Sequence, residues 1–430
     1  MDEIKQIPVG RLQRLSRLAR VGTRTGVSLL LSRGGGAGAA EHAAQLLGSM
    51  RGLAAKIGQM ASYVDGFVPA AQQQAFEVAM KTLRDSAPQS PPQAVLEVLE
   101  AELGQPPSAL FAEFSPVPFA SASIGQVHRA KLKSGEDVAV KVQHPGVDEA
   151  IENDLRNAGM IKQLVATLAT DDFNADALFQ EVAARFREEL DYRLEAERQE
   201  RFASLLRDEP RLSVPRVFHE YSARRVLTSS FASGLNLDQA VAQPEDIRRT
   251  YAEVLWYYAF KTILVDGVFN ADPHPGNYLF QSDGRITCLD FGCVQELNED
   301  VVAHSRAAHL AALRHDEAEF RAAVVHLGNL NGGPYEAAYQ QYLHSCLEPI
   351  FRPTFHITRD FVTDLVQQIF ELKRHALSRR SHMVAVPEST VLLNRLQFGF
   401  MSVVARLDVT VDYATVERKF LRAAGLLAPA

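Results

Sequence analysis

The chain has few cysteines and no long apolar run. Its 430 residues include three cysteines, Cys288, Cys293 and Cys346, whose spacing fits no metal-binding pattern. A disulfide-stapled fold is therefore excluded, and a reducing compartment such as the cytoplasm is expected. The most apolar late stretch, Leu396 to Ala405, has about half of the ~20 residues that a transmembrane helix needs. Any membrane contact is thus expected to be peripheral, without a transmembrane helix.

The overall composition excludes few classes of protein. A formal net charge of −7 argues against general nucleic-acid binding. The apolar fraction of 47% and the charged fraction of 23% are ordinary for a globular protein. The length allows one large domain or two ordinary ones, each with a substantial core.

Acidic residues are missing from Ile4 to Ala40. The same segment is rich in cations: Lys5, Arg11, Arg14, Arg17, Arg20, Arg24 and Arg33. Four of the arginines step by three, together with Leu12, Leu15 and Leu18, which indicates a short basic amphipathic helix. Such a helix suits an anionic membrane surface, at the inner face of the membrane. A disordered tail, or a helix docked on an acidic face of the protein, stays open as an alternative.

Two motifs near the middle of the chain carry chemistry. Asp272-Pro-His-Pro-Gly-Asn277 is followed by the strand-like run Ile286 to Leu289 and then by Asp290-Phe-Gly. Protein kinases hold an Asp and an Asn at this spacing in the catalytic loop, and a metal-binding Asp in Asp-Phe-Gly. We therefore predict Asp272 as a catalytic residue and Asn277 and Asp290 as Mg²⁺ ligands. The alternative is a buried turn in which Asp290 only caps a helix.

An alternating strand is predicted upstream, over Asp137 to Gln143. Its Val-Ala-Val-Lys141 matches the kinase strand whose Lys contacts the α- and β-phosphates and pairs with a helix Glu. A charge-dense helix is predicted over Ala175 to Leu206, and one of its carboxylates is expected to pair with Lys141. Elsewhere such a lysine would be unexceptional. Further strands are expected at Ser213 to His219 and Arg225 to Ser230.

Glycines are missing where a kinase covers the phosphates. The loop reads Ala120, Ser121, Ala122, Ser123, and only Gly125 follows. Alanine carries a Cβ and avoids positive φ, so this nucleotide-contacting loop should be stiffer than a glycine-rich one and admit the triphosphate less freely.

The activation segment of protein kinases is also missing. Only residues 293–298 separate Asp-Phe-Gly from the next expected helix, which begins near Glu299, and no Ala-Pro-Glu follows. The peptide-substrate platform is therefore absent, which weakens a protein kinase function. The rest of the chain, to Leu427, is predicted to be amphipathic helix with breaks at Gly332-Gly333-Pro334, Pro349 and Pro353.

Helices are expected in front of the strands. Glu41 to Val64 has an apolar period near 3.6, with Lys56 and Gln59 on one face. Helices follow over Ala70 to Leu83 and Pro92 to Leu103. These patterns divide the chain into a basic arm and hinge (1–40), a helical extension (41–104), an N-lobe (105–231) and a helical C-lobe (232–430).

Together these residues resemble the UbiB family of atypical kinase-like proteins, also called the AarF-domain or ADCK family. The family signature Lys-x-Gly-Gln stands at Lys56 to Gln59, and Glu-x-Asp at Glu189 to Asp191. The family's alanine-rich loop is Ala120 to Ser123, with a serine at the second place. The resemblance covers the chain from about Gly10 to Asn298.

The resemblance implies an α+β, bilobal protein-kinase-like fold, with the helical extension over the active site and a mostly helical C-lobe. It implies that Glu195 pairs with Lys141, and that Lys56 and Gln59 contact Glu189 in a lid that also includes Asp191. It further implies binding of ATP or ADP with Mg²⁺ and an ATPase activity.

The family supports biosynthesis of ubiquinone or other isoprenoid lipids at membranes. Expected partners are an isoprenoid or quinone-precursor lipid, its biosynthetic enzymes and an anionic membrane surface. A small-molecule phosphotransferase and a non-catalytic scaffold switched by nucleotide stay open as alternatives.

Overall fold

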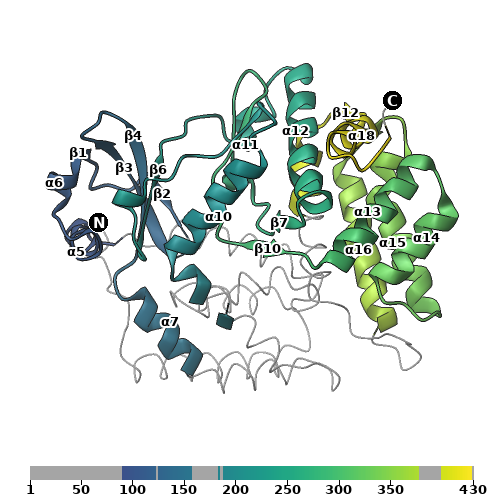
Figure 1. Cartoon of the computed structure of the whole chain (residues 1–430), viewed down its shortest axis with the longest axis horizontal. Helices are drawn as coiled ribbons and strands as arrows, with labels where there is room; N and C mark the ends of the chain where they lie inside the picture. The colour runs from purple at the N-terminus through teal and green to yellow at the C-terminus, as the bar shows by residue number, and fades with distance from the viewer. Residues whose placement is uncertain (1–89, 123, 157–182, 185–186, 377–398, 429–430) are drawn as a thin grey trace, which may run out of the picture. The chain divides into compact units, whose positions relative to one another are not determined.

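The structure is a computed structural model that describes residues 90–122, 124–156, 183–184, 187–376 and 399–428 (Figure 1). The chain divides into two compact units. The N-terminal unit holds the described residues up to Ala196 together with Val217–Phe231, and the C-terminal unit holds Glu197–Arg216 and the chain from Ala232 onward. The four domain limits expected from the sequence stay a prediction, and the first two segments lie almost wholly outside the described residues.

An antiparallel sheet forms the centre of the N-terminal unit, with strand order β1-β3-β4-β6 and β2 paired to β3. Its strands are β1 (Phe111–Phe114), β2 (Ala120–Ser121), β3 (Gly125–Leu132), β4 (Asp137–Gln143) and β6 (Val226–Ser230). The limits predicted for β4 are confirmed. Val138, Val140 and Val142 are fully buried on one face of β4, because alternate side chains of a strand point to the same side.

Three helices of this unit flank the sheet strands in the sequence. They are α5 (Pro92–Leu103), α6 (Pro107–Leu110) and α7 (Val147–Arg156). The predicted limits of α5 are confirmed: it begins at a proline and ends at Gly104, whose φ of 71° is the left-handed cap that glycine favours. Val95, Val98 and Leu99 of α5 share one core cluster with the buried valines of β4.

Two sequence expectations near this unit are wrong. The helix expected from Ala175 to Leu206 is interrupted at Leu190 and Asp191, and α10 (Tyr192–Leu205) begins anew. The Asp191 carboxylate accepts the Arg193 N–H at 3.1 Å, a local bond that competes with helix continuation. The strand expected from Ser213 is only β5 (Leu212–Ser213), because Pro215 has no N–H to donate to a ladder.

The C-terminal unit is mostly helical. Its helices are α11 (Leu237–Ala240), α12 (Glu245–Leu264), α13 (Glu299–Arg314), α14 (Glu317–Leu327), α15 (Pro334–Phe351), α16 (Arg359–Ala376) and α18 (Tyr413–Ala423). The start predicted for α13 is confirmed. The break predicted at Pro349 is wrong: Pro349 lies in the last turn of α15, where its missing N–H removes one hydrogen bond without ending the helix.

Short strands connect these helices. β5 pairs in parallel with β9 (Ile286–Cys288), which pairs with β8 (Tyr278–Phe280). β7 (Val268–Asn270) pairs with β10 (Val294–Glu296), and β11 (Phe355–His356) pairs with β12 (Thr410–Val411). The β7–β10 and β8–β9 pairs are antiparallel, so they bring the two central motifs of the sequence side by side.

A buried polar cluster lies in the core of this unit. The fully buried Glu417 of α18 accepts a hydrogen bond from Trp256 Nε1 at 3.0 Å and one from His309 Nδ1 at 3.0 Å. A carboxylate can only accept, so the imidazole Nδ1 carries the proton. The cluster ties α18 to α12 and α13 through one side chain.

We predict that Glu417→Leu destabilises the protein by about 2–4 kcal/mol, because Trp256 and His309 would each keep a buried donor without an acceptor. Urea unfolding followed by circular dichroism measures the change. Lys419→Leu, an exposed position two residues away, is the control and should change stability by less than about 0.5 kcal/mol. Equal midpoints for Glu417→Leu and wild type would contradict the role of the cluster.

Candidate functional site

The N-terminal unit holds the predicted lysine–glutamate pair. Lys141 Nζ on β4 donates to both carboxylate oxygens of Glu195 on α10, at 2.7 and 2.8 Å. The two side chains are 17% and 8% exposed, so solvent screens their attraction less than on an open surface. The ammonium also lies 5.0 Å from the ring centre of Tyr192, within cation–π range. The structure thus holds Lys141 in one place, and the catalytic roles of the pair stay predictions.

The alanine-rich loop lies at the start of the same sheet. Ala120 and Ser121 form β2 and are exposed, and Ala122 exchanges backbone hydrogen bonds with Gly125 at 2.9 and 3.4 Å. A Cβ atom at Gly125 would overlap the carbonyl oxygen of Val142 on β4, so only glycine fits this close approach. Ser123 lies outside the described residues. The nucleotide contact expected of this loop stays a prediction.

A buried hydrogen-bond chain supports the strand that follows the loop. Gln126 accepts the Ser90 N–H at 2.8 Å and its amide contacts His128 Nε2 at 2.9 Å, while His128 Nδ1 contacts the Ser115 carbonyl at 2.8 Å. Burial lowers the pKa of His128, which favours the neutral ring. Nδ1 then donates to Ser115 and Nε2 accepts from Gln126. The sequence analysis missed this chain, although the alternation of β3 places Gln126 and His128 on the same inward face as Ala130.

The predicted lid residues are only partly described. The Gln143 amide donates to the Glu189 backbone carbonyl at 3.4 Å. Asp191 accepts two side-chain hydrogen bonds from Arg193, which lower the pKa of the Asp191 carboxyl. Lys56 and Gln59 lie outside the described residues. Their contact with Glu189, and the extension over the active site, therefore stay predictions.

The loop 272–277 of the C-terminal unit, which the sequence predicts to be the catalytic loop, brings Asp272 and Asn277 together. The loop leaves β7 and closes in a short 3-10 turn, Pro275–Asn277. The Asn277 amide donates to the Asp272 carboxylate at 3.1 Å and to the Asp272 carbonyl at 3.0 Å. The Leu289 N–H donates to the Asn277 carbonyl at 3.0 Å, which fastens the loop to the residue before Asp290.

Asp290 begins a tight turn and does not cap a helix. Its carboxylate accepts the Gly292 N–H at 2.9 Å, whereas α13 is capped by Asn298, which accepts the Val301 N–H at 2.7 Å. Phe291 is fully buried, with its ring centre 5.0 Å from that of Phe202. The half-buried carboxylate of Asp290 is therefore held at the end of β9 by backbone and packing.

Asn270 links the two motifs, and the sequence analysis missed it. Its amide donates to the Asp290 carbonyl at 2.6 Å, and its Oδ1 accepts the Asp272 N–H at 3.1 Å. The side chain is 7% exposed. A polar residue in the apolar strand just before Ala271-Asp272 was the available signal. Asn270 fixes the backbone at both predicted functional carboxylates.

Gly399 is another residue whose role was not expected from the sequence. A Cβ atom there would overlap Cγ of Pro273 in the catalytic loop. The helical segment 399–407 therefore lies directly against the residue that follows Asp272. Nothing in the local sequence pattern distinguishes this glycine from an ordinary helix start.

The donors around Asp272 are carboxylate and amide oxygens, which are ligand types that Mg²⁺ takes. Within the described residues, no group of three or more His, Cys, Asp or Glu side chains is placed to hold a metal ion. Mg²⁺ commonly takes one or two carboxylates and completes its shell with phosphate oxygens and water. Asp290 offers a carboxylate and Asn277 an amide oxygen, and their ligand roles stay predictions.

Comparison with known proteins identifies the family of this chain. The family model of the ABC1 atypical kinase-like domain matches residues 82–324. An atypical kinase COQ8, mitochondrial, from Saccharomyces cerevisiae is 28% identical over 93% of this chain and 79% of its own length. An atypical kinase COQ8B, mitochondrial, from Rattus norvegicus is 36% identical over 62% of this chain. An uncharacterised Synechocystis protein is 38% identical over 56% of this chain.

The match spans 50% of the length of the rat relative and 35% of that of the Synechocystis relative. Among solved structures, Rv3197 from Mycobacterium tuberculosis in complex with erythromycin is 26% identical, with a TM-score of 0.63 over 89% of this chain and 95% of that one. The α+β kinase-like fold predicted from the sequence is confirmed. In the part of the chain that the structure describes, no helix combines the length and apolar character needed to cross a membrane.

We predict that Asn270→Ala loosens the catalytic loop, because it leaves the Asp290 carbonyl and the Asp272 N–H without their partner. Stability should fall by about 1–3 kcal/mol in urea unfolding. Amide hydrogen exchange across residues 268–292 should become faster. Asn331→Ala is the matched control, since Asn331 is exposed in the loop before α15. Wild-type exchange rates in Asn270→Ala would refute the linking role.

Proposed function

The chain belongs to the ABC1 atypical kinase-like family, which is the UbiB family, and we propose that it binds ATP or ADP with Mg²⁺ and hydrolyses ATP in support of ubiquinone or other isoprenoid-lipid biosynthesis. The observation that carries the proposal is the ion pair of Lys141 with Glu195. Kinases use such a pair to place a cation at the α- and β-phosphates. The pair joins the strand and the helix that carry these two residues in that class of enzyme.

The residues of the catalytic loop have distinct roles in this proposal. Asn277 and Asp290 would hold Mg²⁺, which neutralises phosphate charge when it is bound. Asp272 orients or deprotonates the attacking group, a water molecule or a hydroxyl. The hydrogen bond from the Asn277 amide holds the Asp272 carboxylate in place for that task.

The loop over the phosphates argues for slow turnover. The Ala122–Gly125 backbone bonds close the hairpin, and the alanines carry Cβ atoms that a glycine-rich loop lacks. Behind it the strand is tied by the Ser90–Gln126–His128 chain. We infer a loop that adapts little to the γ-phosphate, and hence a weak ATPase.

The lipid part of the proposal draws its support from the family and from the relatives named atypical kinase COQ8. An isoprenoid or quinone-precursor lipid, together with its biosynthetic enzymes, would be the partner. The basic segment before residue 41 would bring the chain to an anionic membrane surface from the cytoplasmic side, as a peripheral protein. The alternatives are a small-molecule phosphotransferase and a nucleotide-switched scaffold.

We predict that Asp290→Asn weakens Mg²⁺-dependent ADP binding by more than about a hundredfold, because the change removes the carboxylate charge from the proposed metal site. Isothermal titration calorimetry with and without Mg²⁺ measures the loss. Asp283→Asn is the control, since Asp283 is an exposed carboxylate in the turn between β8 and β9. An unchanged affinity in Asp290→Asn would refute the metal assignment.

We predict that ATP turnover rises with anionic liposomes and with a quinone-precursor mimic, and that Lys141→Met reduces it by roughly a hundredfold or more. Lys133→Met, in the exposed turn after β3, should behave as wild type. Released phosphate is measured in each case. Turnover that is indifferent to Lys141→Met would refute the active-site assignment. Nucleotide binding without any turnover would instead support the scaffold.

A further inference from the structure

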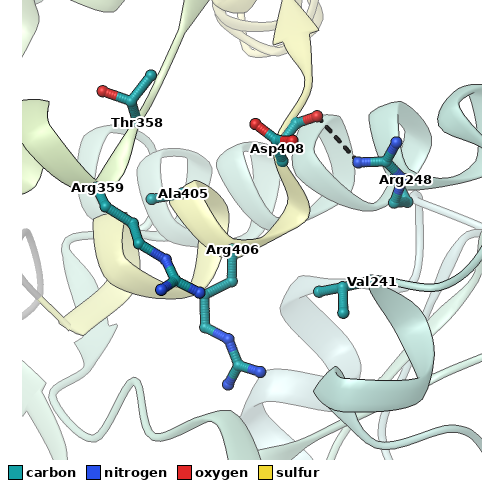
Figure 2. Close-up of a pocket in the computed structure, with 7 residues that line it drawn as sticks. All are labelled: Val241, Arg248, Thr358, Arg359, Ala405, Arg406 and Asp408. Carbon is teal, nitrogen blue, oxygen red and sulfur yellow. Dashed lines mark hydrogen bonds between the residues drawn. The ribbon is translucent and has the colours of Figure 1, made fainter.

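A cavity lies within the C-terminal unit, lined by none of the predicted functional residues. Its volume is about 500 Å³. Figure 2 shows the residues that line it. Three arginines line it: Arg248 from α12, Arg359 from the start of α16 and Arg406 from the helical segment 399–407. The remaining lining residues are Val241, Thr358, Ala405 and Asp408.

The cavity has an excess of positive charge. The lining residues carry three guanidinium groups and one carboxylate, that of Asp408. That carboxylate is already engaged, because His356 Nε2 lies 2.9 Å from its Oδ1. Arg406 has one counter-charge outside the lining, the exposed Asp238. Like charges that share a cavity repel one another, so an anion between them lowers the energy.

The protein holds one of these cations by its backbone. Arg248 donates to the carbonyl oxygens of Gln243, Leu407 and Asp408, the last at 2.9 Å (Figure 2). Carbonyl acceptors fix the guanidinium without neutralising its charge. Arg359 is exposed, and its side chain extends to the same side of the pocket as that of Arg406 (Figure 2).

The first turn of α16 adds to the positive potential. Thr358 Oγ1 accepts the Phe361 N–H at 3.1 Å, so Thr358 caps this helix of 18 residues at the cavity wall. The helix dipole favours an anion at such an end, and the exposed Asp360 in the same first turn is the one acidic side chain there. The arginines and the helix end come from separate parts of the chain and act on the same space.

We propose that this cavity binds a phosphate-bearing anion. Guanidinium groups bind phosphate oxygens in bidentate geometry. Carboxylates can bind in the same geometry, but they carry less negative charge than a phosphate. The volume lies within the range of ~300–1,000 Å³ that small-molecule sites occupy, so it admits an organic phosphate or a diphosphate rather than a single ion alone. The site does not depend on the proposed nucleotide site, because its residues lie outside that set.

The experiment titrates the full chain with inorganic pyrophosphate by calorimetry, at low ionic strength and without Mg²⁺. Arg359→Gln and Arg406→Gln should each weaken binding by roughly tenfold, the loss expected for a charged hydrogen bond. Arg352→Gln, an exposed arginine outside the cavity, is the matched control and should bind as wild type. The part of the binding that depends on Arg359 and Arg406 should persist in the Lys141→Met variant, which separates this site from the nucleotide site.

The same variants identify the source of the phosphate. Flotation with phosphatidylcholine vesicles, with and without phosphatidylglycerol, tests a lipid headgroup. If the Arg359→Gln/Arg406→Gln double variant floats less with the anionic vesicles than wild type does, the ligand is a lipid headgroup. If its flotation is unchanged and pyrophosphate binding is lost, the ligand is a soluble phosphate. Wild-type pyrophosphate affinity in both single variants, or no binding by the wild type, overturns the proposal. Circular dichroism establishes that the variants are folded.

Discussion

The ion pair between Lys141 and Glu195 is the interaction on which the N-terminal unit is built. Neither charge is well solvated, since the two side chains are 17% and 8% exposed. Removal of either partner would break a mostly buried ion pair, which costs more than the loss of a surface pair. The pair therefore sets how α10 lies on β4. The close approach at Gly125 and the polar chain through Gln126 and His128 hold the same sheet from its other strands.

In the C-terminal unit the corresponding order comes from backbone hydrogen bonds. Asn270 bonds to the main chain at Asp272 and at Asp290, and Leu289 bonds to the main chain at Asn277. Main-chain bonds position these residues without consuming all of the oxygen ligands that a nucleotide-bound cation would need. Each unit thus holds its share of the kinase-like residues by a different means, one through charge pairing and the other through amide bonding.

Sequence periodicity was sufficient where a segment repeats one simple pattern. The limits of β4 followed from its alternation, and the start of α5 followed from its proline. Motif spacing indicated Lys141, Asp272 and Asp290 as candidates. The helix interruption at Asp191 depends on one side-chain hydrogen bond. The composition around it strongly favours helix, so the sequence predicted one continuous helix there. Asn270 forms hydrogen bonds with backbone atoms of two separate motifs. The identity of one residue does not predict these bonds. The arginines of the anion cavity are more than forty residues apart in sequence, and only tertiary structure brings them together.

The contact between Gly399 and Pro273 has a consequence for sequence variation. No side chain fits at position 399 without displacing the loop that bears Asp272. In a saturation library selected for activity, substitutions at position 399 should be lost as strongly as substitutions of Asp272. The composition of the C-terminal helices is that of ordinary amphipathic helices. The segment that begins at Gly399 would nevertheless be constrained in evolution by its contact with the Asp272 loop.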